Sequence, residues 1–141
     1  MYKKILVPTD VSGPSRNALL TALELARQFG SEIELFHVTP TPQEFVGYST
    51  EYAVYVAPET IAEAAQAALE AALKDIAPGE VQVKKKYASG HPATAILEEI
   101  KTGFDLVVMG SRGHGPFTGG VIGSVSLRVL AHAECPVLIV R

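Results

Sequence analysis

The chain has 141 residues, of which 48% are hydrophobic and 19% charged, so it has the length of one domain and too much apolar content to stay disordered. Its net charge of -3 excludes binding to nucleic acid or an anionic membrane through diffuse charge alone, and a single cysteine excludes an intramolecular disulfide. The apolar run after Lys3 and Lys4 is too short for a secretion signal or a membrane span. We therefore expect one cytoplasmic domain over residues 1–141.

Hydrophobic periodicity predicts five strands that alternate with four helices. Ser12, Pro14 and Gly30 are typical of helix ends, and they bracket the first helix. Such alternation implies right-handed crossovers and an α/β fold, a doubly wound parallel sheet with helices on both faces. In chain order, the expected elements are strand 5–9, helix 15–29, strand 33–38, helix 61–76, strand 81–87, a helix from residue 92 to the residue before 103, strand 106–109, helix 124–133 and strand 137–140.

The connection over residues 39–57 is long for a compact domain and contains three of the five tyrosines. Loops of this length are often functional flaps or mobile segments. Two interpretations of its tyrosines stay open, a lid over a ligand and a cover for the core.

A glycine-rich segment predicts the functional site. Residues 110–123 contain six of the twelve glycines and connect the fourth strand to the last helix. Glycine amides can approach an anion closely, and the helix N-terminus adds partial positive charge. Arg112 and Ser124 add a cation and a hydroxyl, while Asp10 ends the first strand at the same edge of the sheet, where ligands bind in such folds. The pattern favours a phosphorylated ligand, although Asp10 could instead cap the following helix.

Two common phosphate loops are excluded. The segment has no Walker lysine, and Thr118 stands where the dinucleotide fingerprint needs its last glycine. The observed spacing is Gly110-Ser-Arg-Gly113, nine residues, then Gly123-Ser124-Val125. This spacing resembles the ATP-binding branch of the universal stress protein family. Residues 5–10, 90–92, 105–113 and 135–140 extend the resemblance over essentially the whole chain.

The resemblance implies the strand order 3-2-1-4-5, a homodimer and a bound adenine nucleotide, ATP with Mg²⁺. It implies that Asp10 contacts the ribose or the metal. We also expect Gly123→Val to remove ATP binding, because a β-branched side chain would block the close approach of the backbone to the phosphates and would resist a positive φ at this position. The implied adenine wall is Pro8, Thr9 and Val38, with Met109 as its neighbour. The implied ribose and phosphate contacts are Gly110, Arg112, Gly113, Gly123, Ser124 and Val125.

The leading functional hypothesis is an ATP-binding stress-response regulator. Asp10 is the only carboxylate placed to hold Mg²⁺, and phosphoryl transfer needs more than one arginine to neutralise charge, so hydrolysis should be slow. Two alternatives remain at this stage. One is an enzyme of the related adenine-nucleotide hydrolase fold, and the other is a flavodoxin-like carrier.

Other ionisable residues are predicted to be structural. His37 should pack and form a hydrogen bond, His114 should be solvated, and His132 suits the end of the last helix. Cys135 is expected to behave as a small apolar residue. Lys84 to Lys86 invite a nucleic-acid interpretation, but lysines on an edge strand usually prevent aggregation.

The last strand predicts the dimer contact. With the strand order of the resemblance, residues 137–140 lie at a sheet edge, yet they are all apolar. A bare edge of this kind would promote aggregation. We therefore expect a second copy to cover it across a two-fold axis.

Overall fold

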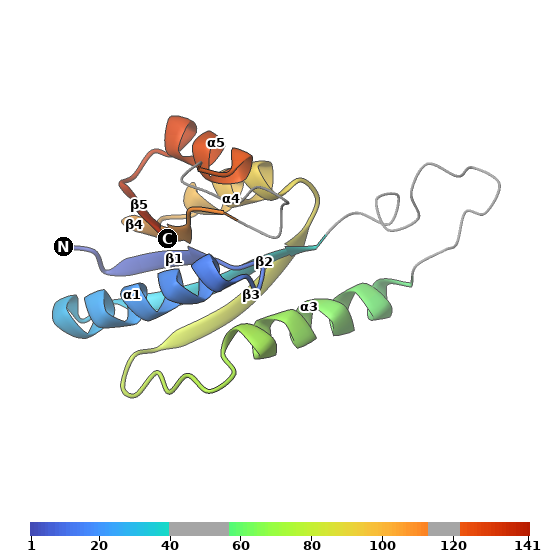
Figure 1. Cartoon of the computed structure of the whole chain (residues 1–141), viewed down its shortest axis with the longest axis horizontal. Helices are drawn as coiled ribbons and strands as arrows, with labels where there is room; N and C mark the ends of the chain where they lie inside the picture. Colours follow the sequence, from blue (N-terminus) through green and yellow to red (C-terminus); the bar gives the residue numbers. More distant parts are fainter. Residues whose placement is uncertain (40–56, 113–121) are drawn as a thin grey trace.

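The computed structural model of the chain describes residues 1–39, 57–112 and 122–141 (Figure 1). Five parallel strands form one sheet in the order β3-β2-β1-β4-β5, as the sequence and its resemblance predicted. The long connection with its tyrosines, and Gly113 with His114, lie outside the described residues. The strands are β1 (Lys4–Pro8), β2 (Glu32–Thr39), β3 (Val83–Ser89), β4 (Leu106–Gly110) and β5 (Val137–Val140).

Helices cover both faces of the sheet, as predicted. Figure 1 shows α1 (Gly13–Phe29) and α3 (Pro58–Ala72) on one face, and α4 (Pro92–Ile100) and α5 (Ser124–His132) on the other. Each face has its own apolar core. Ile5 and Val7 of β1 pack toward α1 and α3, whereas Leu6 packs toward α4 and α5. All three are fully buried, because successive strand residues point to opposite faces and both faces are covered.

Several predicted boundaries were wrong. The helix expected over 61–76 runs from Pro58 to Ala72, and the chain turns at Asp75, which has a φ of 61°. The strand expected over 81–87 spans Val83–Ser89 instead. Its start is displaced because the Val81 N–H donates to the Pro78 carbonyl in a turn. The first helix begins at Gly13, capped by Ser12 as predicted, and ends at Gly30 in the left-handed conformation.

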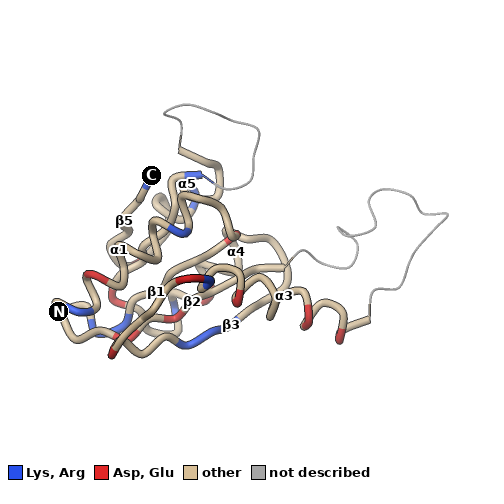
Figure 2. Tube along the Cα trace, turned by 60° about the horizontal axis from the view of Figure 1, so that its bottom comes forward, with Lys and Arg blue, Asp and Glu red and all other residues tan. Residues whose placement is uncertain are grey.

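The lysine run lies on an edge strand, since β3 pairs only with β2 within the described sheet. Figure 2 shows these lysines as a band of positive charge along β3. The Lys84 Nζ lies 3.7 Å from the Glu32 Oε2, and the Lys86 Nζ lies 2.8 Å from the Glu99 Oε1. Two of the three lysines are thus engaged by carboxylates, which favours the edge-protecting interpretation over a nucleic-acid surface. Within the described ranges, no helix has the length and apolarity to cross a membrane.

Candidate functional site

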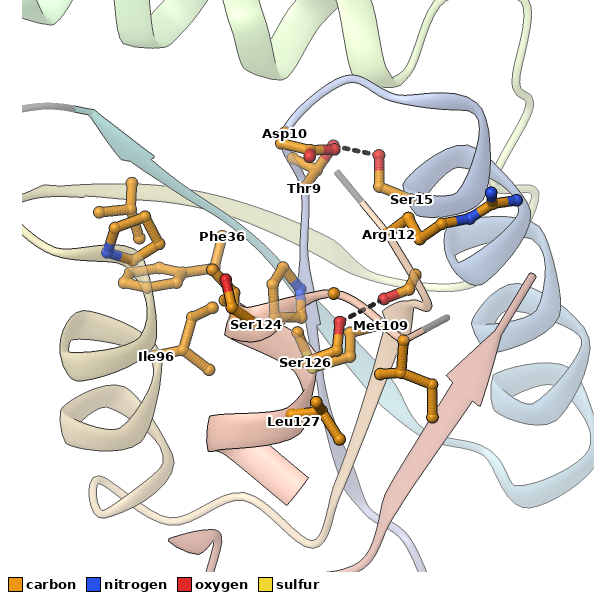
Figure 3. A pocket seen from close by; sticks show the side chains of 17 residues that line it. Thr9, Asp10, Ser15, Phe36, Ile96, Met109, Arg112, Ser124, Ser126 and Leu127 are labelled. Carbon is orange, nitrogen blue, oxygen red and sulfur yellow. Dashed lines mark hydrogen bonds between the residues drawn. The ribbon is translucent and has the colours of Figure 1, made fainter. Parts of the chain in front are cut away.

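A cavity of about 530 Å³ opens at the carboxyl ends of the central strands, beside the start of α5 (Figure 3). It gathers ten of the eleven residues predicted for the site, while Gly113 falls in an undescribed segment. The individual roles of these residues stay predictions. The ten are Pro8, Thr9, Asp10, Val38, Met109, Gly110, Arg112, Gly123, Ser124 and Val125.

Seven further residues line the cavity and were missed by the sequence analysis. Phe36 could have been found, because it shares the strand face of Val38 by alternation. Ile96 could not, because only the packing of α4 against the sheet brings it to the strand ends. The seven are Ser15, Phe36, Pro92, Ile96, Ile122, Ser126 and Leu127.

The cavity has an apolar side and a polar side. Figure 3 shows Phe36 and Ile96 on one side, and Asp10, Ser15 and Arg112 on the other. Asp10 is the only carboxylate and Arg112 the only cation among the described lining residues. An apolar wall beside a few converging polar groups is the usual form of a small-molecule site.

The turn between β1 and α1 forms the polar side. The Asp10 Oδ1 accepts the Ser12 N–H at 3.0 Å, and the Thr9 hydroxyl accepts the Val11 N–H at 3.1 Å. Ser12, not Asp10, caps α1, because its hydroxyl accepts the Ser15 N–H at 3.3 Å. Asp10 therefore orders the turn that precedes the cap while still lining the cavity. Among the described residues, only one of its two carboxylate oxygens is engaged in a hydrogen bond.

The end of β4 packs directly against the start of α1. A Cβ added at Gly110 would lie 2.8 Å from the Pro14 carbonyl carbon and 2.8 Å from the Ser15 nitrogen. The buried Ser126 hydroxyl donates to the Gly110 carbonyl at 2.7 Å, which joins α5 to the same point. The absence of a side chain at Gly110 therefore serves helix packing, a reason that the loop pattern did not reveal.

Gly110→Ala should lower the free energy of unfolding by about 1–3 kcal/mol, because backbone rather than a flexible side chain must move. Gly123→Ala is the matched control. There the nearest atoms lie 3.5 Å from an added Cβ, so we expect a loss of at most about 1 kcal/mol. Urea unfolding of both variants measures the difference. Equal stabilities of the two variants would show that Gly110 is not a packing requirement.

The start of α5 corrects the expectation for Gly123. This residue is the N-cap and has a φ of -65° and a ψ of 158°, not a positive φ. N-cap residues adopt extended backbone to enter a helix, so a β-branched side chain would meet no conformational barrier. The Gly123 N–H donates to the Ser111 carbonyl at 2.7 Å. Among the described residues, no side chain caps α5, and its first-turn amides have no acceptor within the helix.

Comparison with known proteins decides the family. A model described as the universal stress protein family matches residues 1–141. The chain belongs to the universal stress protein family. Two relatives are 34% identical over the whole chain: universal stress protein MJ0531 of Methanocaldococcus jannaschii, 83% of which is covered, and universal stress protein YxiE of Bacillus subtilis, 100% of which is covered. The solved structure of hypothetical protein MJ0577 matches with a TM-score of 0.79 and 28% identity, covering 99% of this chain and 96% of that one.

Two solved universal stress proteins share this fold and are described with a nucleotide. One from Archaeoglobus fulgidus is in complex with dAMP and has a TM-score of 0.69, 22% identity and 99% coverage of this chain and 98% of that one. One from Arabidopsis thaliana has AMP bound and a TM-score of 0.63, 24% identity and coverage of 98% and 90%.

Away from its cavity, this universal stress protein has a cluster of charges between β2, β3 and α4. Lys86 donates to the Glu99 carboxylate at 2.8 Å, and this bond raises the Lys86 pKa. Burial, followed by the negative charge of Glu99, raises the pKa of Glu34 from 4.5 to about 7, although Lys86 and Lys4 oppose the shift. The Glu34 Oε1 is buried and has no hydrogen-bond partner among the described residues. Ionised Glu34 is therefore poorly accommodated.

We predict that stability falls as the pH rises from about 4.5 through about 7. The raised pKa means that folded Glu34 holds its proton where unfolded Glu34 has lost it, so the folded state is favoured at low pH and this advantage disappears above pH 7. Glu34→Gln should flatten the dependence, and Glu98→Gln, on an exposed part of α4, should leave it unchanged. Urea unfolding at pH 5 and pH 8 measures both. An unchanged pH slope in Glu34→Gln would contradict the assignment.

Cys135 is half-buried, and burial is the main cause that raises its thiol pKa. A raised pKa keeps the thiol protonated and weakly nucleophilic. This agrees with its predicted role as a small apolar residue packed beside the α4–α5 core.

Proposed function

We propose that this universal stress protein binds ATP at the carboxyl ends of its strands and acts as a nucleotide-dependent regulator. The single observation that carries the proposal is the two-sided cavity, in which an apolar wall meets Arg112 and the N-terminus of α5, which no described side chain caps. The dAMP and AMP complexes of related folds support an adenine nucleotide as the ligand.

The base would lie against the apolar side of the cavity. Val38 of β2 and Met109 of β4 come from the two strands that flank β1, and Phe36 and Ile96 extend the wall toward α4. These side chains offer dispersion contacts and no charge, which suits a planar aromatic ring. Hydrogen bonds to the base edge would come from backbone groups at the strand ends.

The phosphates would lie at the start of α5. The helix dipole places partial positive charge there, and the first-turn N–H groups of Ser124 and Val125 are oriented for an anion. Arg112 lines the same cavity and supplies a full positive charge. A guanidinium and several backbone amides together form a phosphate-binding set.

Mg²⁺ fits this cavity only as a partner of the nucleotide. Magnesium is usually held by one or two carboxylates together with substrate phosphates. Asp10 supplies the one carboxylate of the described lining, with one oxygen engaged by Ser12 and the other not bonded to any described residue. The ion would neutralise phosphate charge near Asp10.

Binding is better supported than turnover. Hydrolysis needs a group that orients the attacking water and enough charge to stabilise the transferring phosphate. The described lining offers Asp10 and Arg112 for these tasks. Asp10 is already assigned to the metal side, so we propose at most slow hydrolysis.

A homodimer through β5 is part of the proposal. β5 pairs with β4 on one side, and its other edge meets no described strand. Leu138 of β5 is 40% exposed, and Leu127 and Leu130 on the neighbouring α5 are also exposed. A second copy that pairs with this edge would cover these apolar side chains.

The identity of the ligand is tested by releasing it from freshly purified protein with acid and analysing the supernatant by mass spectrometry. The proposal expects an adenine nucleotide in near-stoichiometric amount. A flavin, or an unrelated metabolite in the same amount, would contradict it.

A further inference from the structure

His37 lies outside the cavity yet contacts the turn that forms its polar side. Its Nδ1 lies 2.8 Å from the Thr9 carbonyl oxygen. A carbonyl oxygen only accepts hydrogen bonds, so Nδ1 carries the proton and donates. By alternation along β2, the ring shares the sheet face of Ile33 and Leu35, not the cavity face of Phe36. Among the described residues, its hydrogen-bonded link to the site is the Thr9 carbonyl.

Thr9 is held at three of its polar groups. Its N–H donates to the Phe36 carbonyl at 2.8 Å, and its carbonyl accepts from His37. Its hydroxyl accepts the Val11 N–H at 3.1 Å and lies 3.3 Å from the Ser15 hydroxyl. Because a peptide group is planar, fixing the Thr9 carbonyl also fixes the direction of the Asp10 N–H and Cα.

The turn beyond Thr9 needs such support. Val11 has a φ of 67°, a left-handed conformation that β-branched residues strongly disfavour. Its side chain is 38% exposed, so burial does not explain the conformation. A strained backbone conformation persists where surrounding contacts hold it. Here the Thr9 hydroxyl accepts the Val11 N–H, and the Asp10 carboxylate accepts the N–H of the next residue, Ser12.

We propose that His37 is a positioning residue of the nucleotide site. By holding the Thr9 carbonyl, it keeps the strained turn in the form that presents the Asp10 carboxylate to the cavity and lets Ser12 cap α1. This inference rests on the proposed nucleotide function, but the effect on the turn can be measured without a nucleotide.

The test compares His37→Leu with His37→Asn. Leucine and asparagine have nearly the same size and shape, but only the asparagine amide restores an N–H donor close to the position of the histidine Nδ1. His37→Leu should weaken MgATP binding about tenfold in calorimetry, and His37→Asn should stay within about threefold of wild type. If His37→Leu does not fold, His37→Phe replaces it as the variant that lacks the donor.

Amide hydrogen exchange of Val11 and Ser12 supplies the second measurement, made on nucleotide-free protein. These amides should lose protection in His37→Leu and regain it in His37→Asn. Equal affinity and equal protection in all proteins would overturn the inference, and so would an equal loss in both variants, which would indicate packing alone. If wild type binds no adenine nucleotide, the proposed function fails, while the exchange pattern still supports or overturns the role of His37 in the turn.

Discussion

Ser124→Asp should weaken MgATP binding about a hundredfold and at the same time stabilise the protein. Ser124 is the first residue of α5 and lines the cavity. A carboxylate at a helix start interacts favourably with the dipole, worth about 0.3–1 kcal/mol. The same carboxylate would repel the nucleotide phosphates, and roughly 2.7 kcal/mol of repulsion corresponds to a hundredfold in affinity.

Ser124→Asn is the matched control, because asparagine has nearly the same shape as aspartate and carries no charge. Its affinity should fall far less than that of Ser124→Asp. Calorimetry at fixed ionic strength gives the affinities, and thermal unfolding gives the stabilities. A variant that binds MgATP more weakly but unfolds at a higher temperature cannot have lost affinity through unfolding. If Ser124→Asp and wild type bound MgATP with equal affinity, the proposed position of the phosphates at the start of α5 would be wrong.

Leu138→Lys should convert the proposed dimer into a monomer. The substitution places a charge on the bare edge of β5, where pairing with a second copy would have to desolvate it. Leu138 suits this test better than Ile139, which packs against the α4–α5 core and whose loss would also destabilise the fold. Light scattering at micromolar concentration measures the mass.

Tyr87→Lys is the control for Leu138→Lys, because Tyr87 lies on the opposite edge strand β3 and is 37% exposed, close to the 40% of Leu138. It should leave the mass of two chains unchanged. A wild-type mass of one chain, with or without ATP, would contradict the β5 dimer. If Tyr87→Lys lost the dimer and Leu138→Lys kept it, the dimer contact would be at β3 and not at β5.

Local signals predicted the fold well. The caps at Ser12 and Gly30 bound α1 as expected, and the apolar runs of β1 and β4 are buried on both faces. The strand order came from the family resemblance, because periodicity does not say which strands are neighbours. The errors at the end of α3 and at the start of β3 arose where a turn at residues 73–82 competes with helix and strand.

The sequence predicted which residues line the candidate site better than it predicted their backbone conformation and packing. The pattern brought Asp10, Arg112 and Ser124 to one cavity, but it did not show that Gly110 is required by the packing of α1. It also assigned Gly123 a positive φ that an N-cap residue does not adopt. The packing of Gly110 depends on contacts between distant segments, for which one sequence contains no local signal. The error at Gly123 was avoidable, because a helix that starts at Ser124 makes Gly123 its N-cap.

Titration of nucleotide-free protein with MgATP by isothermal calorimetry tests the central claim most directly. The proposed cavity predicts one site per chain, a dissociation constant in the micromolar range, and weaker binding when ATP is replaced by a nucleotide without the adenine base. Absence of binding at millimolar MgATP, with the fold intact by circular dichroism, would contradict the claim.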